Sequence, residues 1–174
     1  MENTLVVYDS RHGAAKSYAE TLAKELNVKI YPVKKLKKKD IEKIDTLIIG
    51  GSIYMSKLRI LKKLKKHQDT LKQKTLYLFA VGLHDDLAEG IEKVKKDNTL
   101  LELYPIKQYF YFPGKLILRE LKFPYRTIMK FLRAVLSKQE NLKEEEAALL
   151  HEIKTQKDKR DMTLLEPLIT LAKG

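Results

Sequence analysis

The sequence predicts an α/β domain built around a doubly wound, five-stranded parallel sheet. Short apolar runs alternate with amphipathic segments along most of the chain, and polar or glycine-containing turns separate them. Strands that alternate with helices at this interval are joined by right-handed crossovers, which give a parallel sheet covered on both faces. A length of 174 residues suits one such domain, so we expect residues 1–174 to form a single unit.

The first half of the chain shows this alternation clearly. A strand is expected at residues 4–8, where four of the five residues are apolar and a polar turn follows. Residues 13–26 carry apolar side chains three and four positions apart, which predicts an amphipathic helix. A second strand is predicted at residues 28–33, and a third begins at residue 46 and ends at two glycines.

The second half continues the pattern as far as an aromatic run. We expect a Lys-rich helix, a strand, a helix and a fifth strand at residues 58–67, 75–81, 86–96 and 106–112. Residues 114–161 depart from the repeat and are predicted to be an insertion. A closing helix follows, with Thr163 near its start.

Composition excludes several classes of chemistry. The chain has no cysteine, which rules out disulfides, thiolate metal sites and a cysteine nucleophile, and which fits a reducing cytoplasm. Its four histidines are scattered without H-E-x-x-H spacing, and no nucleophile-elbow motif is present, so we expect neither a metal site nor protein-borne catalytic residues. No apolar run is long enough to span a bilayer, which predicts a cytoplasmic protein, soluble or peripheral to a membrane.

Ligands of a doubly wound sheet bind beyond the carboxyl ends of its strands. The first loop there is Ser10-Arg11-His12-Gly13, which opens a helix. Such a turn exposes backbone N–H groups at the positive helix end, Gly13 allows close approach, and Ser10 adds a hydroxyl. Because neither G-x-G-x-x-G nor G-x-x-x-x-G-K-[ST] occurs, a ligand with one phosphate is the remaining prediction.

Two later loops complete the candidate site. The loop after the third strand, GGSIYMS, places an aromatic residue between apolar neighbours that can pack on a planar ring. The loop after the fourth strand, AVGLHDD, offers backbone groups for the edge of such a ring, and Asp85 or Asp86 can cap the next helix.

These three loops resemble those of the flavodoxin superfamily. SRHGAAK resembles its S/T-x-x-G-x-T phosphate loop, GGSIYMS its ring-flanking loop, and AVGLHDD the loop that faces the pyrimidine edge. The charged insertion and LEPLI resemble a group of bacterial flavodoxin-domain proteins. SRHG and YRTIMKFL also resemble the flavodoxin-like, oxygen-independent protoporphyrinogen oxidases. The resemblance implies a three-layer sheet of order 2-1-3-4-5 and a flavoprotein that transfers electrons.

The resemblance also implies FMN as cofactor, held by residues of all three loops: Ser10, Arg11, His12, Gly13, Ala14 and Ala15 around the phosphate, Ser52, Ile53, Tyr54 and Met55 beside the ring, and Val81, Gly82, Leu83 and His84 at its edge. His12 and Ala15 stand where flavodoxins commonly have hydroxyl residues. Losing two neutral hydrogen bonds of about 0.5 to 1.5 kcal/mol each weakens binding, and the charge of Arg11 and Lys16, or of a protonated His12, offsets part of that loss. A flavodoxin fold that has lost FMN therefore stays open as the alternative.

The formal charge of +12 favours anionic partners. Residues 57–74 hold eight Lys or Arg against one acid, Asp69. In the insertion, an apolar helix face lies among basic side chains and is formed by Ile128, Met129, Leu132, Val135 and Leu136. Two interpretations stay open: contact with an anionic membrane or a carboxylate-bearing substrate, or an apolar stripe that completes the core.

The function expected from these observations is an FMN-dependent oxidoreductase or electron-transfer protein. The resemblance makes protoporphyrinogen dehydrogenation coupled to a quinone the most specific reaction it implies. The alternative is a non-catalytic binding protein that contacts an anionic partner through its basic surface. Nucleic-acid binding is not expected, because the charge comes without a recognition motif.

Overall fold

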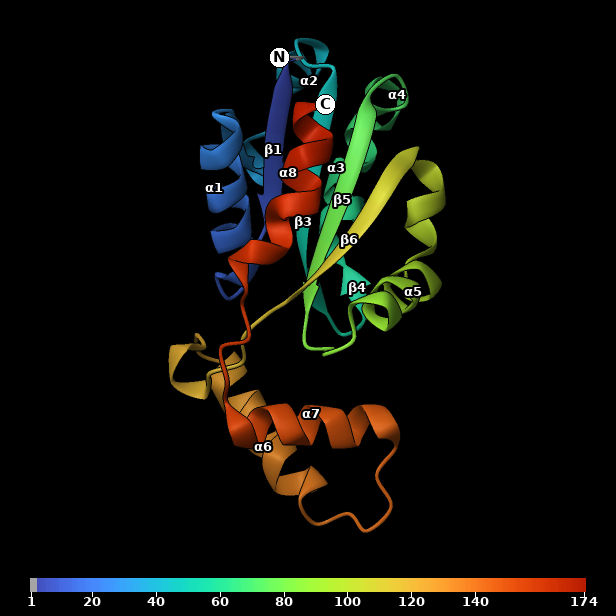
Figure 1. The fold of residues 1–174 in the computed structure, drawn as a ribbon. Coiled ribbons are helices and arrows are strands. Elements are labelled where there is room, and N and C mark those ends of the chain that lie inside the picture. The colour runs from blue at the N-terminus through green and yellow to red at the C-terminus, as the bar shows by residue number, and fades with distance from the viewer. Residues whose placement is uncertain (1–2) are drawn as a thin grey trace.

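The computed structural model describes residues 3–174 and shows a twisted parallel sheet between two layers of helices (Figure 1). The five parallel strands lie side by side in the order β2-β1-β3-β5-β6, which confirms the predicted fold class and its order. Their bounds are Thr4–Asp9 for β1, Lys29–Pro32 for β2, Thr46–Tyr54 for β3, Thr75–Gly82 for β5 and Ile106–Pro113 for β6.

Side chains of the strands alternate between the two faces of the sheet, as a period of two requires. Leu5, Val7 and Ile49 pack on one face against helices α2 to α5, whereas Val6 and Ile48 pack on the other against α1 and α8. The helices are α1 Ala14–Leu26, α2 Lys38–Glu42, α3 Arg59–Leu64, α4 Gln68–Leu71, α5 Leu87–Asp97 and α8 Glu166–Lys173. Short 3-10 turns link several of them, at Val33–Lys35, Lys65–His67, Thr99–Leu103, Leu118–Glu120 and Met162–Leu165.

One strand was not predicted from the sequence. β4, Lys57–Leu58, folds back antiparallel on the end of β3, where Tyr54 pairs with Lys57. The turn residues Met55 and Ser56 have φ values of 48° and 62°, the positive pair typical of a type I′ hairpin turn. A two-residue strand shows no alternation, and its turn lacks the glycine or asparagine that usually marks such a hairpin.

Residues 114–161 leave the sheet after β6 and form an arm of two helices, α6 Tyr125–Leu136 and α7 Glu144–Thr155. The arm lies beyond the carboxyl ends of the strands (Figure 1). It has a small core of its own, made of Leu116, Leu118, Leu121 and Ile153, with Tyr125, Met129, Leu132 and Leu149 packed around it. This position puts one end of α6 against the loops that the sequence nominated for ligand binding.

The predicted apolar face of α6 is divided between the arm's core and solvent. Met129 and Leu132 pack into the arm's core and Leu136 is buried, but Ile128 and Val135 are exposed. They share the outer side of α6 with Phe131, whose exposure is 67%. Only one side of α6 packs against the rest of the arm. The apolar residues next to that side, Ile128 and Val135, therefore face solvent.

None of the described helices is both long enough and apolar enough to cross a lipid bilayer.

Candidate functional site

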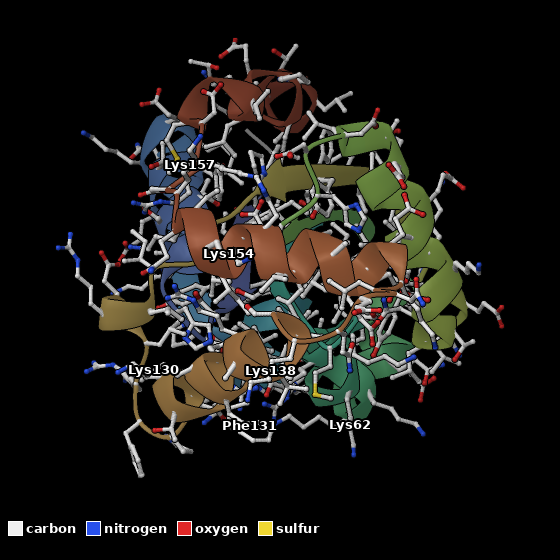
Figure 2. The ribbon with its side chains drawn as sticks, turned by 90° about the horizontal axis from the view of Figure 1, so that it is seen from below. Lys62, Lys130, Phe131, Lys138, Lys154 and Lys157 are labelled. Carbon is white, nitrogen blue, oxygen red and sulfur yellow. The ribbon has the colours of Figure 1, made fainter. Side chains whose placement is uncertain are left out.

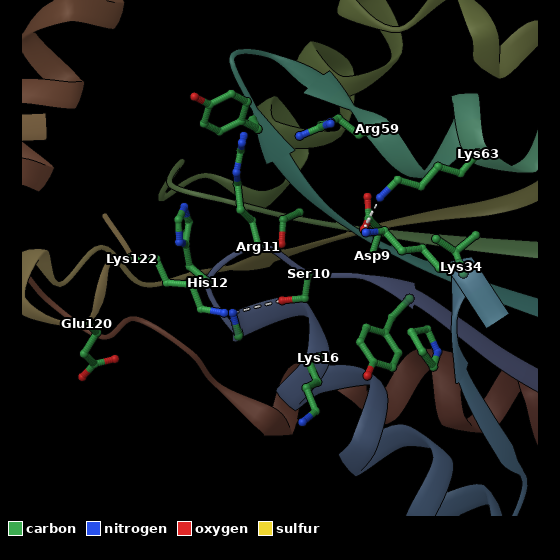
Figure 3. Close-up of a pocket in the computed structure, with 16 residues that line it drawn as sticks. Asp9, Ser10, Arg11, His12, Lys16, Lys34, Arg59, Lys63, Glu120 and Lys122 are labelled. Atoms are coloured by element: carbon green, nitrogen blue, oxygen red, sulfur yellow. Dashed lines mark hydrogen bonds and ion pairs between the residues drawn. The ribbon is translucent and has the colours of Figure 1, made fainter. Parts of the chain in front are cut away.

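A cavity of about 690 Å³ opens at the carboxyl ends of β1 and β3, where the strand order reverses (Figure 3). This switch point is the usual ligand site of doubly wound sheets, and the volume is within the range of small-molecule sites. Polar and charged side chains predominate among its lining residues, which are Tyr8, Asp9, Ser10, Arg11, His12, Gly13, Lys16, Pro32, Val33, Lys34, Ser52, Tyr54, Arg59, Lys63, Glu120 and Lys122.

The first predicted loop forms one wall of this cavity. Gly13 is the N-cap of α1 and has a φ of +90°, a conformation that L side chains rarely adopt. Its N–H donates to Ser10 Oγ at 3.1 Å, which closes the turn. Because no side chain among the described residues caps this helix, its first N–H groups stay available to an anion.

Ala14 and Ala15 lie behind the cavity wall rather than on it. Both are buried, and they pack with Tyr18 and Phe79 in the core between α1 and the sheet. Neither lines the cavity, so their contribution to a bound phosphate would come from backbone N–H groups.

Arg11 crosses the cavity and lies between two aromatic rings. Its guanidinium carbon is 3.9 Å from the ring centroid of Tyr54 and 3.9 Å from that of Tyr125. The two rings are nearly perpendicular, at 81° with 6.0 Å between centroids, and we call the corner that they form the tyrosine slot. Each cation–π contact contributes about 0.5–1 kcal/mol when exposed and about 2 kcal/mol when desolvated. One guanidinium nitrogen, Nη1, is buried without a hydrogen-bond partner among residues 3–174.

His12 shares this environment. Its ring meets Tyr125 edge-on at 5.6 Å between centroids. Burial, together with the positive charges of Arg11 and Lys122, lowers the pKa of His12 below its ordinary value. The imidazole is therefore neutral at pH 7 in the free protein and does not add to the positive charge of the cavity.

The second predicted loop reaches the cavity through alternate residues. Ser52 and Tyr54 line it, whereas Ile53 packs into the core and Met55 is 80% exposed at the hairpin turn. This alternation follows from the extended backbone of β3, which continues to Tyr54.

The buried side chain of Asn98, at the C-terminal end of α5, holds the β3–β4 hairpin in place. Asn98 Oδ1 accepts the N–H of Leu58 at 2.7 Å, and Asn98 Nδ2 donates to the carbonyls of Ser56 at 3.1 Å and Val94 at 2.8 Å. Through these bonds Asn98 fixes the segment between Tyr54 and Arg59, both of which line the cavity.

The third predicted loop is not brought into the cavity. Val81 is buried in the core, and Leu83 packs against the arm. The backbone N–H of His84 donates to Tyr111 Oη at 2.9 Å. Burial raises the pKa of the Tyr111 hydroxyl, which keeps it protonated and fixed below this loop. Gly82 lies close to the same hydroxyl, which a Cβ atom there would approach to 2.3 Å.

Sequence reasoning missed several residues that complete the cavity: Lys122, Glu120, Arg59, Lys63, Lys34, Tyr8 and Asp9. Arg59 and Lys63 belong to the basic stretch at residues 57–74, whose charge alone does not indicate where in the fold it lies. Tyr125 is 71 positions after Tyr54 in the chain, and no local pattern predicts that the arm would bring the two rings together.

The cavity is strongly positive. Six cations line it against two carboxylates, and both carboxylates are already paired. Asp9 bonds Lys63 at 2.5 Å, and Glu120 bonds Lys115 at 2.6 Å. Clefts lined by one sign of charge concentrate counter-ions, so this cavity attracts anions.

A match to a protein-family model shows which family the chain belongs to. A family model described as a flavodoxin domain matches residues 5–143. The chain belongs to this flavodoxin domain family. No curated protein matches it detectably.

Several solved structures are similar to this chain at low sequence identity. A putative flavoprotein from Bacteroides eggerthii DSM 20697 is 18% identical with a TM-score of 0.50, over 80% of this chain and 100% of that one. A flavodoxin from the domain Archaea is 14% identical with a TM-score of 0.46, over 87% and 98%. An apo-form NADH:FMN oxidoreductase is 12% identical with a TM-score of 0.49, over 97% and 99%.

In this flavodoxin-family chain, one part of the cavity suits the phosphate of FMN and another part suits its flavin ring. The helix N-terminus, Ser10 and the surrounding cations suit a phosphate group. Beside it, the Tyr54 and Tyr125 rings meet edge to face, so a planar group can stack on one of them at a time, and the guanidinium of Arg11 now covers both. A flavin ring in that slot requires Arg11 to turn away, and its unpartnered Nη1 is then free to bond an anion.

Proposed function

We propose that this flavodoxin-family protein binds FMN in the cavity and acts as an FMN-dependent oxidoreductase or electron-transfer protein. One observation carries the proposal: an open helix N-terminus, the Ser10 hydroxyl and the Tyr54 ring line a single cavity at the switch point of the sheet. Phosphate-binding N–H groups and an aromatic ring at that place match the two ends of a flavin nucleotide.

The protein's part is to bind and orient the cofactor. Ser10 to Gly13 and the N–H groups of Ala14 and Ala15 hold the phosphate, and Ser52 and Tyr54 flank the ring. FMN, when bound, supplies hydride and single-electron transfer, so none of the cavity side chains needs to be a redox group.

A titration tests this proposal directly. The visible spectrum of the purified protein and its titration with FMN should show binding, and riboflavin should bind more weakly because it lacks the phosphate. The variant Ser10→Ala should weaken FMN more than riboflavin, while the exposed control Ser137→Ala should change neither. A colourless protein that binds no FMN at micromolar concentration would overturn the proposal.

The second candidate is a flavodoxin-fold protein that has lost FMN and binds an anionic partner. It is favoured by Arg11, which fills the tyrosine slot and satisfies both rings without any ligand. The same titration separates the two, because this candidate binds inorganic anions in the cavity but neither FMN nor riboflavin.

A more specific reaction within the leading proposal is dehydrogenation of a porphyrinogen coupled to a quinone. It is supported by the excess of cations in the cavity, since Arg and Lys suit the carboxylates of such a substrate. Anaerobic incubation of FMN-loaded protein with protoporphyrinogen and a quinone should yield the fluorescent porphyrin. No product with any quinone acceptor would eliminate this reaction and leave FMN binding unaffected.

We also propose that the protein contacts anionic membranes from the cytoplasm through the outer side of α6. Residues 121–139 contain five cations and no carboxylate, and Ile128, Phe131 and Val135 are exposed there. Figure 2 shows Lys130 and Phe131 on this helix and Lys138 just after its end. Exposed apolar side chains among cations are the pattern of an interfacial helix.

Vesicle sedimentation tests this contact. The protein should sediment with phosphatidylglycerol vesicles at low salt and less with phosphatidylcholine vesicles. Phe131→Ser should reduce binding, whereas Leu171→Ser, which removes an exposed apolar residue from α8, should not. Equal behaviour of the two variants would rule out α6 as the contact.

A further inference from the structure

The cavity extends past the phosphate loop to a second group of cations. Lys34, Arg59 and Lys63, which we call the Lys34 cluster, line this part of the wall. Figure 3 shows Lys34 and Lys63 on the opposite side of Ser10 from His12 and Lys122. The cluster is therefore separate from the loop at Ser10 to Gly13, although both belong to one cavity.

Three elements build the cluster. β1 and β2 are parallel neighbours, and Tyr8 is in register with Pro32, so the chain segments that follow them leave the same edge of the sheet. Lys34 is in the turn after β2. Arg59 and Lys63 are four residues apart on α3 and thus lie on one side of that helix.

Two cations of the cluster have no carboxylate partner. Asp9 bonds Lys63 at 2.5 Å, but no carboxylate of residues 3–174 bonds Lys34 or Arg59. Both side chains are exposed in the open cavity, where their charges repel each other and that of Arg11. A bound anion would remove this repulsion.

One phosphate does not account for the charge of the cavity. Arg11, Lys34, Arg59 and Lys122 all lack a carboxylate partner among the described residues. A phosphate monoester carries about −1.5 to −2 at pH 7. Arg11 and Lys122 lie beside His12, close to the phosphate loop, and they are enough to neutralise that group. Lys34 and Arg59 are then left over.

We propose that the Lys34 cluster binds a second anionic group, a phosphate or carboxylate, while a phosphate occupies the loop at Ser10 to Gly13. We also infer, on the basis of the proposed function, that this second anionic group belongs to the compound that exchanges electrons with FMN. Figure 3 shows Arg59 on the same side of the cavity as the Arg11 guanidinium, next to the tyrosine slot. An anion on Arg59 thus places its carrier beside the position assigned to the flavin ring.

The test uses FMN-loaded protein and two probes. Inorganic pyrophosphate represents a phosphate source and citrate a carboxylate source, each titrated by calorimetry at low salt. At least one should bind without displacing FMN. The double variant Lys34→Gln/Arg59→Gln should weaken that probe by about tenfold or more, since each lost contact is a charge-assisted bond. The matched control Lys35→Gln/Lys62→Gln changes exposed neighbours that do not line the cavity and should leave binding unchanged.

The outcomes separate this inference from the proposed function. If FMN binds but neither probe does, or if both variants lose affinity equally, the second anion site is wrong. If a probe expels FMN, the cavity holds one anion and the inference is also wrong. If FMN fails to bind, inorganic phosphate is titrated into the free protein and followed by the NMR amide signals. Residues 10–16 should then shift with one affinity, and residues 34 and 59 with another. That result would support the second anion site and reject only FMN as the cofactor.

Discussion

Gly13 adopts a φ of +90° with nothing within 4 Å of the place where a Cβ would lie. Backbone conformation, and not crowding, therefore requires glycine at this turn. Placing an L side chain in the left-handed region costs about 1–2 kcal/mol. The same turn orients the N–H groups that face the cavity, so stability and anion binding depend on one residue.

We predict that Gly13→Ala lowers the free energy of unfolding by about 1–2 kcal/mol. For a chain of this size each 1 kcal/mol corresponds to about 2–4 °C in Tm. Gly13→Asn should lose less, because asparagine tolerates the left-handed region better. Thermal denaturation of both variants checks this. Equal Tm values for Gly13→Ala and the wild type would mean that the loop relaxes freely.

His12 makes FMN binding depend on pH. Burial and the charges of Arg11 and Lys122 lower its pKa in the free protein, whereas a bound phosphate favours the imidazolium and raises it. Proton uptake therefore accompanies binding, and affinity should increase as pH falls from 8 to 6.5. Fluorescence titrations of FMN over this range measure the trend. His12→Gln, which keeps the titration of the phosphate itself, should show a flatter dependence.

At the scale of elements, the β3–β4 hairpin depends on Asn98. We predict that Asn98→Ala lowers the free energy of unfolding by about 1–3 kcal/mol, because the buried N–H of Leu58 loses its acceptor. Asn98→Asp keeps the acceptor but loses the donor to Ser56 and Val94, so its effect isolates the second half of the contact. Urea denaturation of the three proteins measures the difference. FMN affinity should fall in Asn98→Ala, because Tyr54 lies on the same hairpin.

The sequence predicted elements whose pattern is local. Strands such as β1 and β5 are continuous apolar runs, and α1 has regular spacing, so periodicity identified them. Periodicity could not predict β4, because a strand of two residues shows no repeat. It also predicted a Lys-rich helix up to residue 67, whereas α3 ends at Leu64 and the chain continues as a 3-10 turn.

The candidate site divides in the same way. Ser10 to Gly13 could be located because a strand, a glycine turn and a helix follow one another in the chain. Lys122 and Lys34 could not, because their place in the cavity depends on how the arm and the β2 turn pack in three dimensions. The outward position of Ile128 and Val135 likewise depends on which side of α6 has a neighbour.

For the whole molecule, two histidines link stability to pH. Burial, together with the charge of Lys66, lowers the pKa of His67, although a backbone contact with Leu36 opposes the shift. Like His12, it favours the neutral form when folded. The unfolded chain takes up protons near the ordinary value of about 6.5, so the folded state should lose stability as pH falls below that value.

We predict that the free energy of unfolding decreases between pH 7 and pH 5.5, measured by urea denaturation. The double variant His12→Gln/His67→Gln should show a smaller decrease over the same range, whatever its absolute stability. His151→Gln changes an exposed histidine of α7 and should keep the wild-type slope. Identical slopes in all three proteins would assign the pH dependence to other groups.

The chain enters and leaves the arm beside one hydroxyl of α1. Tyr18 Oη donates to the carbonyl of Pro113 at 2.8 Å and accepts the N–H of Asp161 at 2.9 Å, so the chain leaves and returns at nearly the same point. One contiguous stretch of coding sequence therefore specifies the roof of the cavity, including Tyr125 and Lys122. Deleting or exchanging that stretch in one genetic event would change which ligands enter while every strand of the sheet kept its neighbours.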